Sequence, residues 1–232
     1  TGIFSGDECL AGKSPTQGTE LCAVVEYAFS MEVLLSILGD PLFADRLEKM
    51  VFNALPAAFL PDMWSRQYDQ QVNQTECSIQ PRNWTTNFPD ANIYGLEANY
   101  GCCTANFSQG FPKFAANLWM AVPGENQKEG LALCAYAPCR VTHLIQGKTV
   151  SIEVTTDYPF SGTALLSLEL SEPLRFPLYV RIPGWADEAA YQVNDLPICR
   201  AQTGSFTVIE REWFSGDAVH ITLPMHPRRI EH

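Results

Sequence analysis

Residues 20–38 read ELCAVVEYAFSMEVLLSIL and are followed by Gly39, Asp40 and Pro41. Thr19 before this segment is a suitable helix N-cap, and a glycine followed soon by a proline is a usual helix end. Apolar residues recur on two stripes with a helical period, so little of the helix surface is polar. The segment therefore predicts an α-helix that is buried on most sides.

Two more helices are expected close to this one in the chain. A second is predicted at about 41–55, with a proline in its first turn and apolar residues on one face. A third is predicted at about 103–117, although Gly110 and Pro112 should kink it. Between them, residues 60–100 are predicted to be irregular, and a connection of this length in a compact domain is usually functional.

The hydrophobic period changes to two near Asn117. Short alternating segments then follow, separated by Gly, Pro and Asp, and this pattern predicts an antiparallel β-sandwich. The segments are 131–138, 149–159, 163–171, 177–185, 205–213 and 218–224. The predicted fold class is α+β and multidomain, with a helical domain over 1–116 and a β-sandwich domain over 117–232, both expected to be incomplete.

The composition excludes several classes of protein. The 232 residues are 46 % hydrophobic and 11 % aromatic, which is enough for a packed core and excludes intrinsic disorder. The formal charge is −11, so no nucleic acid is expected as a partner. No apolar run approaches the roughly 18–20 residues of a membrane span, so no span is expected. The chain begins with Thr1 and has no signal peptide, so it is interpreted as an interior piece of a longer protein of unknown localisation.

Cysteines and glutamates form the densest group of reactive side chains. Glu20 and Cys22 lie at one predicted helix start, Cys102 and Cys103 lie at another, and Glu8 precedes them all. Three thiolates and a carboxylate suit a tetrahedral Zn²⁺ site. Each residue also has a plainer explanation, because a cysteine in an apolar helix is usually a core residue and a first-turn glutamate can serve the helix dipole alone. The residues by themselves leave both interpretations open.

Common catalytic motifs are missing from the chain. It contains no Gly-x-Ser-x-Gly, no glycine-rich nucleotide loop and no His-Glu-x-x-His. All histidines lie in the β-rich half, so a histidine-assisted cysteine protease cannot be assembled in the helical half.

Several segments of the sequence match the pattern of one known family. They are GDECLAG at 6–12, GTELCAVVEYAFSMEVLL at 18–35, FADRLEKMVFNAL at 43–55, NYGCCTANF at 99–107, DYPFSG at 157–162, LYVRIPGWA at 178–186 and REWFSGD at 211–217. On these segments the chain resembles glycoside hydrolase family 127, the β-L-arabinofuranosidases and their relatives. The resemblance covers essentially the whole chain in order, and the pairing of Glu-x-Cys with Cys-Cys is its most specific part.

The resemblance implies a fold and a metal. Family members have an (α/α)₆ barrel with β-sandwiches beside it, so residues 1–116 would be the C-terminal part of the barrel and 117–232 the sandwich. The family's zinc ligands match four residues of this chain: Glu20, Cys22, Cys102 and Cys103. A homodimer interface on the sandwich is also suggested by the resemblance.

The resemblance also implies residue roles and a reaction. Cys102 matches the nucleophile, Glu8 the general acid/base, and Glu48 and Tyr68 match residues that contact the sugar. The implied activity is that of a retaining glycoside hydrolase, which releases non-reducing-end β-L-arabinofuranose from an arabinose-containing oligosaccharide or glycan. A zinc-bound thiolate can replace the usual carboxylate nucleophile, because the metal keeps it ionised and fixes its direction.

The chain departs from the family pattern in three ways. The interval between Glu8 and Glu20 is short, the half of the barrel that carries the family's substrate-binding histidines is absent, and family members continue beyond the last residue. The chain is therefore expected to be a fragment. Two alternatives stay open: a catalytically degenerate, zinc-containing sugar-binding relative, and an unrelated protein whose cysteines coincide by chance.

Overall fold

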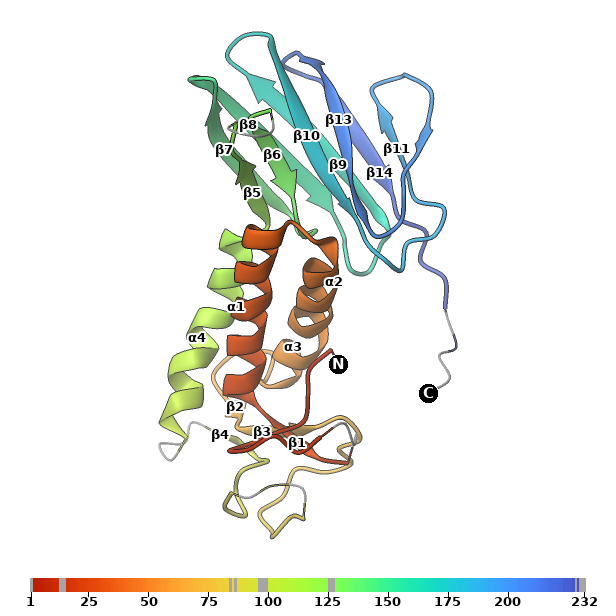
Figure 1. Cartoon of the computed structure of the whole chain (residues 1–232). Helices are drawn as coiled ribbons and strands as arrows, with labels where there is room; N and C mark the ends of the chain where they lie inside the picture. Colours follow the sequence, from red (N-terminus) through yellow and green to blue (C-terminus); the bar gives the residue numbers. More distant parts are fainter. Residues whose placement is uncertain are drawn as a thin grey trace. The chain divides into compact units, whose positions relative to one another are not determined.

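The chain divides into two compact units, and helices dominate the first while strands dominate the second (Figure 1). A computed structural model describes residues 2–12, 16–83, 85, 87–95, 100–124, 128–227 and 229. The first unit comprises Thr1–Leu38 and Arg46–Ala116, and the second comprises Gly39–Asp45 and Asn117–His232. The fold is thus mixed α+β with several sheets, in agreement with the predicted class at that level.

The helices of the first unit lie close to where the sequence predicts them. Gly39 adopts the left-handed conformation, with φ 65°, at the end of the first predicted helix, as a C-terminal glycine should. The predicted second helix is confirmed as a continuous helical segment. In chain order the elements are α1 (Leu21–Leu38), α2 (Pro41–Lys49), η1 (Met50–Ala54) and α3 (Leu55–Ala57).

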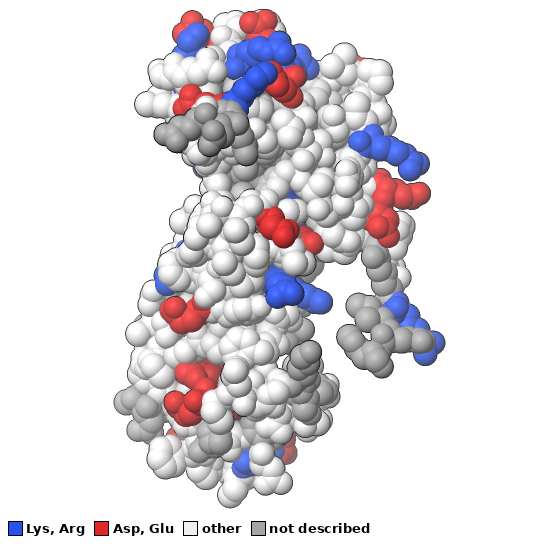
Figure 2. All heavy atoms as spheres, viewed as in Figure 1, with Lys and Arg blue, Asp and Glu red and all other residues white. Residues whose placement is uncertain are grey.

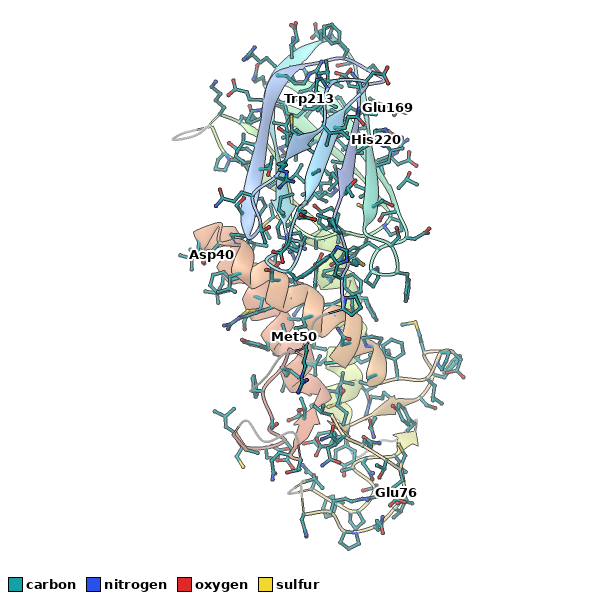
Figure 3. All side chains as sticks on the ribbon, turned by 90° about the vertical axis from the view of Figure 1, so that its right-hand side faces the viewer. Asp40, Met50, Glu76, Glu169, Trp213 and His220 are labelled. Carbon is teal, nitrogen blue, oxygen red and sulfur yellow. The ribbon has the colours of Figure 1, made fainter. Side chains whose placement is uncertain are left out.

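The element η1 is a π-helical turn that begins at Met50, which is labelled in Figure 3. The backbone N–H of Leu55 donates to the carbonyl of Met50, five residues back, instead of four. The Asn53 side chain donates from Nδ2 to the carbonyl oxygen of Lys49 at 2.8 Å. A π turn leaves one carbonyl without its usual helical partner, and Asn53 supplies a replacement.

The prediction that α1 is buried on most sides is wrong for one face of the helix. Val24 and Leu35 are 0 % and 2 % exposed, whereas Val33 and Ile37 are 39 % and 70 % exposed. Both stripes are apolar in the sequence, but the described parts of the chain cover only one of them.

The length of α1 corrects a second expectation. α1 is the one helix among the described residues that is long and apolar enough to cross a membrane. The sequence prediction that no such run exists is wrong, because Glu26 and Glu32 interrupt the apolar letters without making the 18-residue helix polar on average. The core helix of a globular protein passes the same test, and a single helix of this kind is weak evidence for a span.

The third predicted helix is α4 (Gly101–Ala116), which continues through Pro112. A Cβ atom at Gly110 would lie 3.1 Å from the Leu55 side chain and 3.4 Å from that of Val25. Gly110 thus allows α4 to approach the other helices closely, and α1 and α4 lie side by side (Figure 1).

Short strands occur where the sequence is predicted to be irregular. β1 (Gly18–Glu20) pairs antiparallel with β3 (Asp69–Gln71), and β2 (Arg66–Gln67) pairs antiparallel with β4 (Tyr94–Gly95). The residues at 66–70 are all buried although most of them are polar. A buried polar strand carries no hydrophobic alternation, which is why the sequence pattern fails here.

Two larger sheets form most of the second unit. Their strands are β5 (Trp119–Val122), β6 (Gly130–Leu133), β7 (Cys139–Ile145), β8 (Lys148–Thr156), β9 (Thr163–Leu170), β10 (Leu174–Ile182), β11 (Ala190–Val193), β12 (Cys199–Arg200), β13 (Ser205–Trp213) and β14 (Ala218–Thr222). Among the described residues, one sheet has the order β13-β10-β6-β5 and the other has the order β12-β11-β14-β9-β8-β7. The prediction of purely antiparallel pairing is wrong for β6 and β10, which pair in parallel. The three strands between them in the chain provide the long connection that parallel pairing needs.

Alternating side chains of these strands form the core of the second unit. In β8, Val150, Ile152 and Val154 are at most 2 % exposed, while the residues between them are more exposed. Trp213, labelled in Figure 3, is fully buried, and its indole N–H donates to the carbonyl of Phe176 at 3.0 Å. In β8 the period of two in the sequence thus becomes one buried and one outer face of the strand.

The second unit also contains a buried arginine. Arg181 in β10 is 0 % exposed; its guanidinium pairs with the Asp45 carboxylate and donates from Nε to the carbonyl of Cys134 at 2.5 Å. The second oxygen of Asp45 accepts from the backbone N–H of Gly184 at 2.8 Å. These contacts pair the charges of Arg181 and Asp45 inside the unit.

Replacing Arg181 with methionine is expected to destabilise the protein by about 3 kcal/mol, because breaking a buried ion pair leaves an uncompensated charge. The free energy of unfolding, measured by urea denaturation, checks this. The matched control is Arg140→Met, since Arg140 forms only exposed pairs with Glu153 and Glu169. The free energy of unfolding of this control should fall by less than about 1 kcal/mol. Equal losses in the two variants would contradict the prediction.

Charged side chains on the face drawn in Figure 2 lie in small, separate groups, and basic and acidic groups adjoin each other over the strands. The second unit also has exposed ion pairs, such as those of Arg140, which lies 2.7 Å from Glu153 and 3.3 Å from Glu169. Such pairs contribute little to stability, so the buried contacts decide the fold.

Candidate metal centre and active site

Two helices of the first unit carry the predicted ligands. β1 runs directly into α1, so Glu20 and Cys22 lie where the strand becomes the helix. Cys102 and Cys103 lie in the first turn of α4. The first turns of α1 and α4 lie at the same end of the helix pair (Figure 1), so the two ligand pairs face a common region.

The four side chains of this cluster converge on one point. The sulfur atoms of Cys22 and Cys103 are 3.2 Å apart, and Glu20 Oε1 lies 3.9 Å from the Cys103 sulfur. All four ligand atoms, which belong to Glu20, Cys22, Cys102 and Cys103, lie within 4.8 Å of one another. A tetrahedral zinc ion with Zn–S bonds of about 2.3 Å needs sulfur atoms about 3.8 Å apart. Three sulfurs and one carboxylate in this arrangement fit such an ion.

The members of the cluster differ in their exposure. Cys103 is fully buried, Glu20 and Cys22 are half-buried, and Cys102 is exposed. Cys102 is therefore the sulfur that a molecule from solution can reach most easily.

The pKa values in the cluster reflect the crowding of acidic groups. The neighbouring thiol of Cys103 and, after it, burial raise the pKa of Cys22. Burial raises the pKa of Cys102 as well. Burial, followed by the nearby carboxylates of Glu8 and Asp7, raises the pKa of Glu20. The ionised forms of Glu20, Cys22 and Cys102 are therefore disfavoured when no cation is close to them. A divalent metal ion would compensate their negative charge.

The predicted acid/base, Glu8, is exposed and contacts Tyr68. The Tyr68 hydroxyl donates to Glu8 Oε1 at 3.0 Å. Burial and, after it, the Glu20 carboxylate raise the pKa of Tyr68, so this hydroxyl keeps its proton near neutral pH. Tyr68 thus links the predicted acid/base to the edge of the ligand cluster.

Tyr68 and Arg66 connect the starts of the two helices. The carbonyl of Tyr68 accepts from the backbone N–H of Leu21 at 2.8 Å, and its ring stacks on that of Tyr100 with centroids 4.1 Å apart. Arg66 donates to the carbonyl of Tyr100 at 2.6 Å and, from Nε, to the hydroxyl of Thr104 at 2.9 Å. The strand segment 66–71 therefore holds α1 and the cysteine-bearing turn of α4 together.

The predicted sugar-contacting Glu48 is not a member of the four-residue cluster. It sits in the last turn of α2, just before η1, and is 4 % exposed. The Asn53 behind it in the sequence uses its amide to support the π turn.

Several residues around the site are not found by the sequence analysis. Asp7, Thr85 and Asn87 contact the Glu8–Tyr68 pair or its neighbours. A hydrogen bond from the Asn106 side chain favours the thiolate of Cys22, so it acts against the other influences on that pKa. Asn106 follows Cys102 by one helical turn, so helical spacing could have indicated it. No local pattern marks Thr85 or Asn87, which lie in an irregular segment.

Two family profiles match the sequence, and each covers one half of the chain. The profile for the β-L-arabinofuranosidase GH127 catalytic domain matches residues 4–116. The profile for the GH127 middle domain matches residues 130–225. The chain belongs to glycoside hydrolase family 127.

Solved structures agree with this assignment at the level of the fold. A GH127 β-L-arabinofuranosidase from Geobacillus stearothermophilus T6 matches with TM-score 0.79 and 20 % identity, over 100 % of this chain and 36 % of that one. A GH127 β-arabinofuranosidase matches with TM-score 0.77 and 19 % identity, over 97 % of this chain and 36 % of that one. A protein described as a glycoside hydrolase matches with TM-score 0.75 and 22 % identity, over 90 % of this chain and 33 % of that one.

The chain spans about a third of the length of these solved proteins. The search of curated proteins gives no match. The family 127 fold and the cluster of Glu20, Cys22, Cys102 and Cys103 are therefore the observations on which a function can be argued.

A further buried acid of this family 127 chain lies across from Glu20. Asp69 in β3 pairs in register with Glu20 of β1 and is fully buried. Its carboxylate lies so close to Gly18 that a Cβ atom there would sit 2.5 Å from its oxygens. Burial raises the pKa of Asp69 to about 8, and the carboxylates of Asp7 and Glu20 add to this effect.

Replacing Asp69 with asparagine is expected to stabilise the protein at pH 8 and to have little effect at pH 4. The folded-state pKa is raised from 3.8 to about 8, so the ionised form costs stability as the pH rises through this range. Each pKa unit corresponds to about 1.4 kcal/mol, so a gain of at least about 2 kcal/mol is expected at pH 8. Thermal unfolding at both pH values checks this, with the exposed Asp195→Asn as the control. A gain at pH 4 equal to that at pH 8 would contradict the prediction.

Proposed function

We propose that the protein containing this chain is a retaining glycoside hydrolase that releases non-reducing-end β-L-arabinofuranose from arabinose-containing glycans. The convergence of Glu20, Cys22, Cys102 and Cys103 within 4.8 Å is the observation that carries the proposal. Membership of glycoside hydrolase family 127 supports a glycan substrate. The solved relatives described as β-L-arabinofuranosidase and β-arabinofuranosidase support the choice of sugar.

We propose that the four residues hold Zn²⁺ and that Cys102 is the nucleophile. The soft sulfur ligands favour zinc over the oxygen-preferring cations. The bound ion would keep the sulfur ligands ionised at neutral pH and fix their direction. Cys102 is the exposed member of the cluster, which suits a group that must reach the substrate.

In the first step, Cys102 Sγ attacks the anomeric carbon while Glu8 protonates the leaving oxygen. The bond between the anomeric carbon and that oxygen breaks, a carbon–sulfur bond forms, and Glu8 is left as a carboxylate. The product on the enzyme is a thioglycoside of Cys102.

In the second step, Glu8 removes a proton from a water molecule, which attacks the same carbon. The carbon–sulfur bond breaks, Cys102 is released as a thiolate, and Glu8 regains its proton. Two inversions at one carbon retain its configuration. Each turnover consumes one water molecule and restores both residues.

We assign Glu48 and Tyr68 to sugar binding, and we place the chain in the family's architecture. Residues 1–116 are proposed to be the C-terminal part of an (α/α)₆ barrel, and 117–232 part of a β-sandwich domain. The exposed apolar stripe of α1, which includes Val33 and Ile37, supports a missing helical neighbour. Pairing of two copies through the sandwich stays a prediction.

The complete gene product, assayed on p-nitrophenyl arabinofuranosides of both anomers, tests the proposal. We expect hydrolysis of the β-L anomer alone, release of the β-anomer of arabinose first by NMR, and about one zinc per chain by mass spectrometry. Zinc without hydrolysis of either substrate would favour a degenerate sugar-binding relative. Absence of zinc from the native protein would overturn the proposed metal centre.

A further inference from the structure

A chain of hydrogen bonds leads from Glu8 into an irregular part of the first unit. The Tyr68 hydroxyl lies 3.0 Å from Glu8 Oε1 and 2.9 Å from Asn87 Nδ2. Asn87 Nδ2 also lies 3.4 Å from Asp7 Oδ2, and the hydroxyl of Thr85 donates to that same oxygen at 2.9 Å. Neighbouring residues 7 and 8 are thus held by one network.

The chemistry of the network determines the direction of its hydrogen bonds. An ionised Asp7 can only accept, so Asn87 must turn its NH₂ group, and not its carbonyl oxygen, toward Asp7. The same NH₂ group faces the Tyr68 oxygen, which must therefore accept from Asn87. The single hydroxyl proton of Tyr68 is then directed to Glu8 Oε1.

The position of Asn87 is itself fixed. Its backbone N–H donates to the hydroxyl of Thr85 at 3.1 Å, and that hydroxyl binds Asp7. The Tyr68 ring is fixed by stacking on Tyr100 and is only 2 % exposed. Neither Asn87 nor the Tyr68 ring can move far without breaking a second contact.

We propose that Asn87 is a positioning residue for the acid/base, acting through Tyr68. By directing the Tyr68 proton to Glu8 Oε1, Asn87 leaves Oε2 as the oxygen that carries the catalytic proton to the leaving group. An oxygen that accepts a hydrogen bond in the carboxylic acid is the carbonyl oxygen, so the acid proton resides on the other one. This inference rests on the proposed role of Glu8.

Two substitutions of Asn87 in the complete protein separate this role from a merely structural one. Asn87→Asp has nearly the same shape but presents only acceptors, so the Tyr68 proton turns away from Glu8. Asn87→Ala removes the donor and leaves Tyr68 free to donate to Glu8. We expect Asn87→Asp to lower hydrolysis of an arabinose disaccharide relative to a p-nitrophenyl arabinoside by on the order of 10–100-fold. Asn87→Ala should lower the same ratio by only about 5-fold, and Tyr68→Phe by a similar amount.

A structural role would give the opposite order, because alanine removes more atoms than aspartate. The control is Asn73→Asp, an exposed asparagine of the same unit, which should leave the ratio unchanged. In a Glu8→Gln background, Asn87→Asp should not change the ratio further. Equal losses on the two substrates, or a larger loss for Asn87→Ala than for Asn87→Asp, would overturn the inference.

Crystal structures of Asn87→Asp and of the control Asn73→Asp separate this inference from the proposed function. In Asn87→Asp the distance between the Tyr68 oxygen and Glu8 Oε1 should exceed hydrogen-bonding range, whereas Asn73→Asp should retain about 3.0 Å. An unchanged Tyr68–Glu8 contact in Asn87→Asp would overturn the inference whether or not the protein hydrolyses arabinosides. An inactive wild-type protein with the expected structural change would instead overturn the proposed function alone.

Discussion

Replacing Cys102 with serine in the complete protein is expected to abolish glycoside hydrolysis and to lower its zinc content. The substitution removes the proposed nucleophile and one of the four ligand atoms of the cluster together. Serine is a much weaker nucleophile than a thiolate and a poorer zinc ligand. We expect kcat/KM for p-nitrophenyl arabinoside to fall by on the order of 10⁴-fold or more. Zinc should be measured by mass spectrometry in the same samples.

A second cysteine provides the matched control. Cys199 in β12 is an exposed free thiol in the other unit, so Cys199→Ser should retain full activity and zinc. Cys22→Ser should lose zinc in the same way as Cys102→Ser, because both sulfurs belong to the cluster. A Cys102→Ser protein with at least half of the wild-type activity would exclude Cys102 as the nucleophile.

Elements with a strong hydrophobic period are predicted well. The helix at 20–38 and the strands at 149–159, 163–171, 205–213 and 218–224 all appear in the structure within a few residues. Weaker patterns are missed. β7 (Cys139–Ile145) and β11 (Ala190–Val193) contain more half-buried than buried residues, so their alternation is faint in the sequence.

The buried, mostly polar segment at 66–70, which contains β2 and the start of β3, is the clearest failure of the sequence analysis. Arg66 and Asp69 are 6 % and 0 % exposed, although charged residues are rarely buried. Their burial depends on partners far away in the chain, such as Tyr100 for Arg66. A pattern rule that expects apolar letters in a buried strand cannot find such a segment.

The cluster of Glu20, Cys22, Cys102 and Cys103 and the hydrogen-bonded network differ in how far the sequence indicates them. Residue types at helix starts suggest that Cys22 and Cys103 could share an ion, and their sulfurs lie 3.2 Å apart. The contact of Tyr68 with Asn87 joins two irregular segments, and no spacing in the sequence predicts it. Residue types that could bind a metal ion can thus be found from the sequence, whereas the residues that contact Tyr68 and Glu8 need the structure.

Replacing Glu8 with glutamine is expected to slow hydrolysis in proportion to how much the leaving group needs a proton. A glutamine side chain keeps the shape of Glu8 and the acceptor for Tyr68 but has no acidic proton that it can transfer to the leaving oxygen. A p-nitrophenolate leaves without protonation, so the first step should be largely spared. A sugar alkoxide must be protonated before it can leave. Hydrolysis of an arabinose disaccharide should therefore fall by on the order of 10²–10⁴-fold. Values of kcat/KM for the two substrates, which report the first step, check this.

The zinc content and the second step provide the controls for Glu8→Gln. Glu8 is not a member of the four-residue cluster, so the variant should keep its zinc and differ from Cys102→Ser in that respect. With p-nitrophenyl arabinoside the second step should become limiting, because no base activates the water, and a burst of p-nitrophenol should precede slow turnover. Azide is a nucleophile that needs no base, so it should partly restore turnover and yield arabinosyl azide. If Glu8→Gln hydrolyses the disaccharide at the wild-type rate, a different residue must protonate the leaving oxygen.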